Sequence, residues 1–375
     1  MKIQRIFLLY ILMNVIAFLH LDVAPAFAAA NNPQPIDYIN GVVLSVQSLE
    51  ISSNKNMGVT GKNLITIQLT SGAEAGKEVQ SINYTTNQPL FDISPSPGDK
   101  IILAVNETQS VKQYHVADYN RLFPMYILVG VFILSLLLLG KKIGVKTLFV
   151  ICFSVILILK GMIPLILSYH WNFILATMLV CAVIATVTQI TISGWNAKTW
   201  GAIIGTVGGV VIAGILAAIS ISWMHLTGLD SEEAMMLKVT TLSFMNFQEV
   251  LFAGIILGSL GAVMDVTISI ASTQFEIKKS CPHYGFTEVF KSGINVGRDV
   301  MGTMANTLIL AYTGSSLPLI FLITSQENVS LVRIMNLNIV ATEITRALTG
   351  SIGLICSIPL TAAITALLLS RINKQ

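Results

Sequence analysis

The sequence predicts a mainly helical membrane protein, with about seven transmembrane helices in a bundle and a small exported β-domain before them. Three observations support this fold class. Of the 375 residues, 54% are hydrophobic and only 11% are charged, whereas soluble domains carry about a quarter charged residues. Apolar runs of membrane-spanning length recur after Arg121. Before that point, short runs of alternating apolar and polar residues are typical of strands.

Residues 1–28 have the three parts of a secretory signal peptide. Lys2 and Arg5 form a basic start, an apolar run follows, and Ala26-Phe27-Ala28 matches a cleavage site of small residues. We expect cleavage after Ala28, and an uncleaved anchor helix is the alternative. Either way, residues 29–120 are expected on the outer side of the cell membrane.

Residues 29–120 predict a small antiparallel sheet or a partly closed barrel. In the first strand candidate, Val42, Leu44 and Val46 share one face. The further strand candidates are residues 65–69, 79–84 and 100–105. No catalytic constellation occurs in this domain, so we expect it to pack or to contact a partner.

Residues 121–375 predict a polytopic membrane domain. Its apolar segments are Leu122–Leu139, Val145–Leu167, Phe173–Ser193, Trp200–Met224, Phe247–Val266, Met301–Ile323 and Gly350–Leu369. Loops with several Lys and Arg residues alternate with loops that have few. The positive-inside rule then places residues 29–120 outside and the C-terminus in the cytoplasm. Residues 325–349 depart from this rule, and their pattern predicts an amphipathic surface helix, with a re-entrant segment as the alternative.

Two polar stripes are the main candidates for function. Residues at helical spacing form one stripe from Asp265 and another from Asp299: Asp265, Ser269, Ser272 and Glu276, and Asp299, Thr303, Asn306 and Thr313. If the two helices pack antiparallel, the stripes could meet and line a path for a small solute or ion. The alternatives are interhelical hydrogen bonds and a place at the inner water boundary.

Lys160 lies deep in an apolar run and needs a counter-charge or a cavity. We expect it to pair with Glu249 of another helix. The alternative is that its helix starts or breaks near Gly161 and Pro164, which would leave Lys160 at an interface.

Glycine marks two further features. Gly201, Gly205 and Gly209 repeat every four residues, as Gly254 and Gly258 do, which favours close helix packing. A Gly/Pro interruption at residues 314–318 predicts a kink, and a broken helix with a binding site is the alternative.

Several classes of function find no support in the sequence. It contains no C-x-x-C pair, no phosphate-binding loop and no basic tract, so we expect no metal site, no cofactor, no nucleic-acid partner and no enzymatic activity.

Four motifs resemble the YibE/YibF-like family of bacterial multi-pass membrane proteins: HLTGLDSEEA (225–234), GSLGAVMDVTISIAS (258–272), GRDVMGTMANTLILAYTGSSLPL (297–319) and SIGLICSIPLTA (351–362). The front domain, with Gly98-Asp99 and ADYNR (117–121), resembles the longer YibE-like members. The resemblance implies a bacterial plasma membrane and marks Asp265, Arg298, Asp299 and Asn306 as family-typical positions without assigned roles. A paired homologous membrane protein is a candidate partner beside the lipid bilayer.

Two functions follow as expectations. The first is a permease-like protein with a polar path near Asp265 and Asp299. The second is a scaffold that does not transport and that binds envelope partners through its outer domain.

Overall fold

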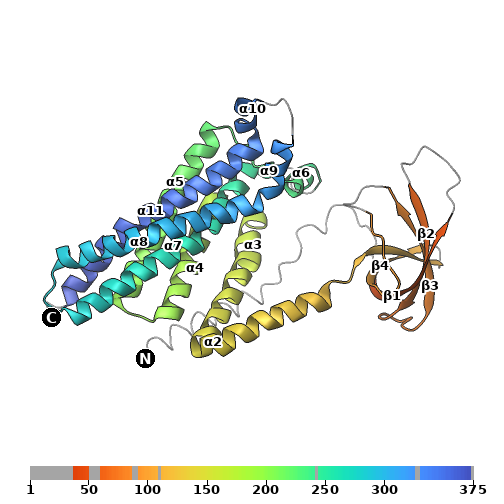
Figure 1. Ribbon diagram of the computed structural model, residues 1–375, viewed down its shortest axis with the longest axis horizontal. Coiled ribbons are helices and arrows are strands. Elements are labelled where there is room, and N and C mark those ends of the chain that lie inside the picture. Colours follow the sequence, from red (N-terminus) through yellow and green to blue (C-terminus); the bar gives the residue numbers. More distant parts are fainter. Residues whose placement is uncertain are drawn as a thin grey trace. The chain divides into compact units, whose positions relative to one another are not determined.

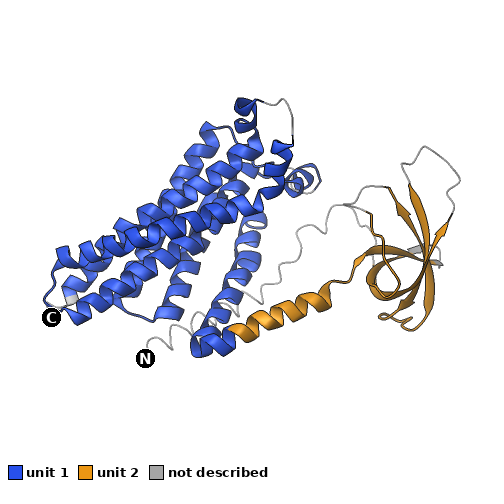
Figure 2. Ribbon diagram, viewed as in Figure 1, with its two compact units in different colours: residues 1–27, 136–375 blue, residues 28–135 orange. Residues whose placement is uncertain are grey.

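The computed structural model describes residues 37–49, 60–86, 92–108, 111–240, 244–325 and 330–372. They form two compact units, one that ends at Ser135 and one that begins at Leu136 (Figure 2). The predicted signal peptide lies outside the described residues, so its cleavage stays a prediction.

The first unit holds a five-stranded antiparallel sheet in the order β3-β2-β1-β4-β5 (Figure 1). The strands are β1 (Asp37–Leu49), β2 (Gly61–Leu69), β3 (Glu78–Thr85), β4 (Lys100–Thr108) and β5 (Val111–Tyr119). The Ser81 hydroxyl donates to the Tyr114 carbonyl at 2.7 Å, which links the two outermost strands. The sheet is therefore a half-barrel, as the sequence predicts.

The core of this unit explains two departures from the predicted strands. Val43 is 1% exposed and Leu44 is 41% exposed, because a bulge between Val43 and Ser45 shifts the alternation of β1. The predicted common face of residues 42, 44 and 46 is therefore wrong. Strand β5 is absent from the predicted strands. Only its Tyr114, Val116 and Tyr119 pack against the core.

The second unit contains long apolar helices. Five helical runs are long and apolar enough to cross a membrane: residues 122–167, Phe173–Ser193 (α4), Ala197–Trp223 (α5), Phe247–Ser280 (α7) and 338–371, the last within α11 (Asn338–Ile372). A bent pair, α8 (Phe286–Ser315) and α9 (Leu317–Thr324), makes six if it counts as one span. The short helices α6 (Glu232–Val239) and α10 (Leu331–Met335) lie between them in sequence.

The first apolar run differs from the two helices that the sequence predicts. It consists of α2 (Leu122–Ile156), the π-helix η1 (Leu157–Met162) and α3 (Ile163–Leu167). Within α2, however, Lys141 has φ 47° and ψ −122°, far from helical values. A Cβ at Gly144 would collide with the Leu136 carbonyl, so the chain is tightly bent here. The break falls in the segment that was expected to separate the two helices.

Helix α11 also corrects a prediction. It begins at Asn338, so residues 338–349 are its first turns and not a separate helix on the membrane surface. Thr342, Thr345 and Thr349 are buried on its inner side. The expected seventh span, Gly350–Leu369, is thus the second part of a longer helix.

Asparagine side chains begin three of the long helices. Asn172, Asn196 and Asn246 each accept a hydrogen bond from a backbone N–H in the first turn of α4, α5 and α7, respectively. These contacts satisfy donors that a helix start leaves unpaired, which fixes where each helix begins.

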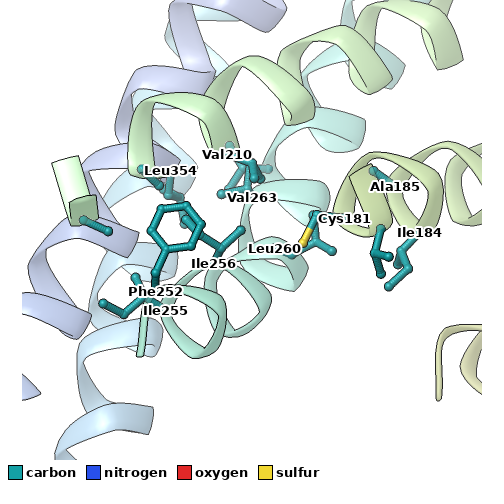
Figure 3. Close-up of a cluster of buried hydrophobic side chains, with 14 of the residues drawn as sticks. Cys181, Ile184, Ala185, Val210, Phe252, Ile255, Ile256, Leu260, Val263 and Leu354 are labelled. Atoms are coloured by element: carbon teal, nitrogen blue, oxygen red, sulfur yellow. The ribbon is translucent and has the colours of Figure 1, made fainter. Parts of the chain in front are cut away.

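Helix α7 packs against α4, α5, α8 and α11. Its side chains Phe252, Ile256, Leu260 and Val263 join a buried cluster with Val210 of α5 and residues of the neighbouring helices (Figure 3). The membrane unit is therefore arranged around α7.

Helices α5 and α11 approach each other closely because glycine faces small polar residues. A Cβ at Gly205 would collide with the Thr361 side chain and lie 3.1 Å from its Cα. Gly201 stands in the same relation to Thr365, and Gly209 faces Ser357. The predicted packing role of this repeat is confirmed. The second repeat differs, since nothing lies within 4 Å of a Cβ at Gly254.

Buried amides join the helices. Gln189 Nε2 donates to Thr206 Oγ1 at 2.7 Å, and Thr206 Oγ1 lies 2.7 Å from Thr267 Oγ1, which connects α4, α5 and α7. Gln274 Nε2 donates to the carbonyls of Val289 and Ala362 at 2.9 and 3.0 Å, which connects α7, α8 and α11. Each such contact contributes about 0.6–2 kcal/mol.

We predict that Gly205→Ala lowers the stability of the purified protein by about 1–3 kcal/mol, because the added methyl group forces α5 away from α11. Thermal unfolding in detergent, followed by a fluorescent thiol probe, measures the change. Gly254→Ala is the matched control and should unfold at the wild-type temperature. Equal unfolding temperatures for both variants would contradict the packing assigned to Gly205.

Candidate functional site

Helices α7 and α8 lie side by side and run antiparallel. Gly258 faces Tyr312 near one end, and Gln274 faces Gly293 near the other. Between them, Gly297 approaches Ile270. The antiparallel packing on which the two predicted stripes depend is therefore present.

The α7 stripe faces out of the bundle. Asp265, Ser269 and Glu276 are exposed, and Ser272 is half-buried. The Ser269 hydroxyl donates to the backbone carbonyl of Asp265 at 2.7 Å. No hydrogen bond or ion pair of the Asp265 carboxylate occurs in the described part of the chain.

The α8 stripe faces outward as well. Asp299, Thr303, Asn306 and Thr313 are all exposed. Thr303 donates to the carbonyl of Val300 on its own helix at 2.9 Å. Among the described residues, no hydrogen bond or ion pair joins this stripe to that of α7. Within one copy of the chain, the two stripes are thus neighbouring outer faces and not the two walls of one interior path.

The buried amides locate Asp265 relative to the helix ends. Gln189 lies about 6 Å from Ser193, the last residue of α4, at 1.5 Å per residue. Gln189 is hydrogen-bonded to Thr206, and Thr206 lies beside Thr267, so Gln189 and Thr267 lie at about the same depth in the bundle. Asp265 lies about 3 Å further toward the middle of the bundle. If α4 crosses the bilayer, Asp265 is within its hydrocarbon and not at its boundary, since a helix of 21 residues is just long enough to span.

Asn306 lies deeper still. It is about 13 Å along α8 from Gly297 on one side and from Ser315 on the other. Gly297 packs on Ile270, which is one turn beyond Thr267. In a bilayer about 30 Å thick, Asn306 is therefore close to the middle.

Lys160 and Glu249 do not form the predicted ion pair. Lys160 is exposed on the π-helix η1, a distortion that often occurs at functional sites. Glu249 Oε1 instead accepts a hydrogen bond from Asn246 Nδ2 at 3.3 Å, at the start of its own helix. No salt bridge joins Lys160 and Glu249 in the ranges that the structure covers.

The interruption at residues 314–318 is a sharp bend. Helices α8 and α9 meet at an angle of 63°, with Pro318 in the first turn of α9. A cavity of 300 Å³ lies beside the bend, between α8, α9 and α11. Its polar wall is formed by Tyr312, Thr313, Ser316 and Glu343. Sequence reasoning singled out Thr313 and the bend, but it did not anticipate Tyr312 or Glu343 as neighbours.

Charged groups gather at this end of α11. The Arg346 guanidinium lies 3.8 Å from the Asp230 carboxylate and 3.6 Å from that of Glu343. Glu343 Oε2 and the Tyr312 hydroxyl are buried and form no hydrogen bond in the described part of the chain. Both oxygens are thus shielded from solvent in this conformation, and the Glu343 carboxylate is held by Arg346 through its other oxygen.

The cavity wall is mainly apolar, and four side chains bring oxygen atoms to it. A carboxylate, a phenol and hydroxyls suit a hard cation or a ligand that donates hydrogen bonds. Within the described ranges, no three His, Cys, Asp or Glu side chains come together as metal ligands.

We predict that Arg346→Met destabilises the protein by about 1–3 kcal/mol, because Asp230 and Glu343 lose the positive charge between them. Unfolding temperatures in detergent test this. Arg333→Met, on the exposed helix α10, is the matched control and should change little. Adding Asp230→Asn and Glu343→Gln to Arg346→Met should restore much of the loss, and a further loss would contradict this account.

Comparison with known proteins gives one match. Neither a curated protein nor a solved structure matches the chain. The model of the YibE/F-like protein family matches residues 128–371, well over half of the 375 residues. The match covers α4, α5, α7, α8, α9 and α11, and with them both polar stripes and the cavity. This multi-span membrane protein therefore belongs to the YibE/F-like family.

Proposed function

We propose that this protein is a permease-like membrane protein that moves a small cation, without enzymatic activity. The observation that carries the proposal is the bend between α8 and α9, beside a cavity whose lining includes Tyr312, Thr313, Ser316 and Glu343. Broken helices with polar groups at their free ends are typical of substrate sites in transporters.

The charges of the exposed and cavity residues favour a cation. Glu343 lines the cavity, and Asp265 and Asp299 lie on the exposed faces of α7 and α8. Thr313 belongs both to the cavity wall and to the α8 stripe, so the stripe leads from the cavity toward Asp299. Lipid tails cannot solvate these groups, which supports a water-lined or protein-covered path.

The proposed topology has seven spans. The break at Lys141 divides residues 122–167 into two membrane crossings, and the bent pair α8–α9 supplies another. The sheet of β1–β5 then lies outside and the C-terminus in the cytoplasm, in agreement with the distribution of Lys and Arg in the loops. This orientation places the cavity toward the outer end of α8.

A scaffold is the second candidate function, and the sheet supports it. A cavity of 630 Å³ opens on the first unit, lined by Tyr38, Glu74 and Tyr114 among others. Tyr38 and Tyr84 are 64% and 53% exposed. Of these two, Tyr38 lies beside the cavity, and exposed aromatic side chains are typical of surfaces that bind a protein partner.

Cation flux into proteoliposomes tests the permease. Entrapped dyes for H⁺, for alkali cations and for divalent metals report which cation enters. For the cation that moves, Glu343→Gln should slow the flux about tenfold or more, because a charged partner contributes about 1.5–3 kcal/mol. Glu233→Gln, on the exposed surface of α6, should retain the wild-type rate. If the folded wild-type protein moves none of these cations, the scaffold would be favoured.

Thiol labelling tests the wet path independently of any substrate. In a background without Cys152, Cys181, Cys281 and Cys356, we expect Thr313→Cys to react with a membrane-impermeant maleimide added from outside. Leu179→Cys, exposed on α4, should be protected by lipid and serves as the control. Protection of both Thr313→Cys and Ser316→Cys, which lie in the same cavity wall, in a folded protein would show that the cavity is closed to water, against the proposed path.

A further inference from the structure

We propose that α8 forms the contact between two copies of this chain, related by a two-fold axis perpendicular to the membrane. The face concerned is exposed along its whole length, and its last two residues, Ile309 and Thr313, also line the cavity beside α9 and α11. We call this face the α8 seam: Asn295, Asp299, Gly302, Asn306, Ile309 and Thr313.

The spacing of the α8 seam is that of a supercoiled helix pair. Steps of four and three residues alternate along it from Asn295 to Thr313. The average repeat of 3.5 residues keeps one face turned toward a partner helix over several turns. At Gly302, nothing lies within 4 Å of an added Cβ, so space for a partner is open there.

Asn306 indicates which partner fits. Its amide lies near the middle of the bilayer, is exposed and forms no hydrogen bond among the described residues. Lipid tails offer no acceptor or donor, whereas a protein partner can supply both. An amide is itself donor and acceptor and therefore pairs with an identical amide. Two copies with the same orientation in the membrane bring their Asn306 side chains to the same depth.

Charge also favours a second copy. Arg298 stands beside the seam residue Asp299, and neither forms an ion pair in the described part of the chain. In a parallel two-helix supercoil, the position that precedes a seam residue packs next to the same seam residue of the other helix. Each Arg298 thus reaches Asp299 of the partner subunit, and the two pairs are equivalent under the two-fold axis.

The dimer does not depend on transport. It covers the polar face of α8 whether or not a cation moves. Since Thr313 belongs both to the α8 seam and to the cavity wall, the second copy would also stand beside the proposed entry to the path.

Disulfide cross-linking in membranes tests the contact. In the background without native cysteines, Ile309→Cys and Asn306→Cys should each form a covalent dimer of twice the chain mass under mild oxidation. Ile215→Cys, exposed on α5, is the control and should remain monomeric. The Ile309 variant is included because it keeps Asn306. Absence of a dimer for both seam variants, or cross-linking only to a different membrane protein, would overturn the proposal.

The strength of association supplies a second readout. We expect Asn306→Leu to weaken dimerisation roughly threefold to thirtyfold, the range that follows from a membrane hydrogen bond of about 0.6–2 kcal/mol. Asn306→Gln keeps both hydrogen-bonding groups and should stay closer to wild type. Energy transfer between labelled copies in liposomes, followed as lipid is added to dilute the protein, measures the association of both variants. Equal association of the Leu variant and the wild type would overturn the role given to Asn306. If the dimer forms but the wild-type protein moves no cation, that result would count against the permease alone.

Discussion

The cost of an unsatisfied polar group in hydrocarbon governs this structure. Inside the bundle, that cost is met by paired contacts. Gln189 shares hydrogen bonds with Thr206 and through it with Thr267, and Gln274 bridges two carbonyls on different helices. On the outer faces of α7 and α8, by contrast, Asp265 and Asn306 lie at membrane depth without a partner among the described residues. The same constraint therefore explains the packed interior and indicates where the chain is incomplete by itself.

Glycine sets how closely the helices approach, and it does so unevenly. Gly201, Gly205 and Gly209 let α5 meet the Ser and Thr side chains of α11 almost backbone to backbone. Gly254, Gly261 and Gly302 have open space where a side chain would be. Spacing alone does not separate these two uses, because Gly201–Gly205 and Gly254–Gly258 share the period of four, yet nothing lies beside Gly254. Only the position of the neighbouring helix decides between them.

Much of the architecture could be predicted from the sequence, and the failures have local causes. Long apolar runs locate the helices because lipid demands them. Alternation predicts four of the five strands. The bulge beside Val43 makes the predicted face of β1 wrong, and the pattern of β5 is too weak to predict that strand. The stripes from Asp265 and Asp299 were read correctly as shared faces, yet helical periodicity does not say toward what a face points. The cavity residues Tyr312 and Glu343 are 31 positions apart in sequence, so only the fold brings them together.

The joined edges of the β-sheet restrict how anything can bind to it. Because Ser81 of β3 bonds to the carbonyl of Tyr114 in β5, the sheet has little free edge along that line. An open edge invites strand addition, in which a foreign peptide extends the ladder with little regard for its side chains. At the point where β3 and β5 meet, the Ser81 contact occupies the Tyr114 carbonyl and leaves it unavailable to an added strand. A partner that binds there therefore has to be recognised by its side-chain shape and charge.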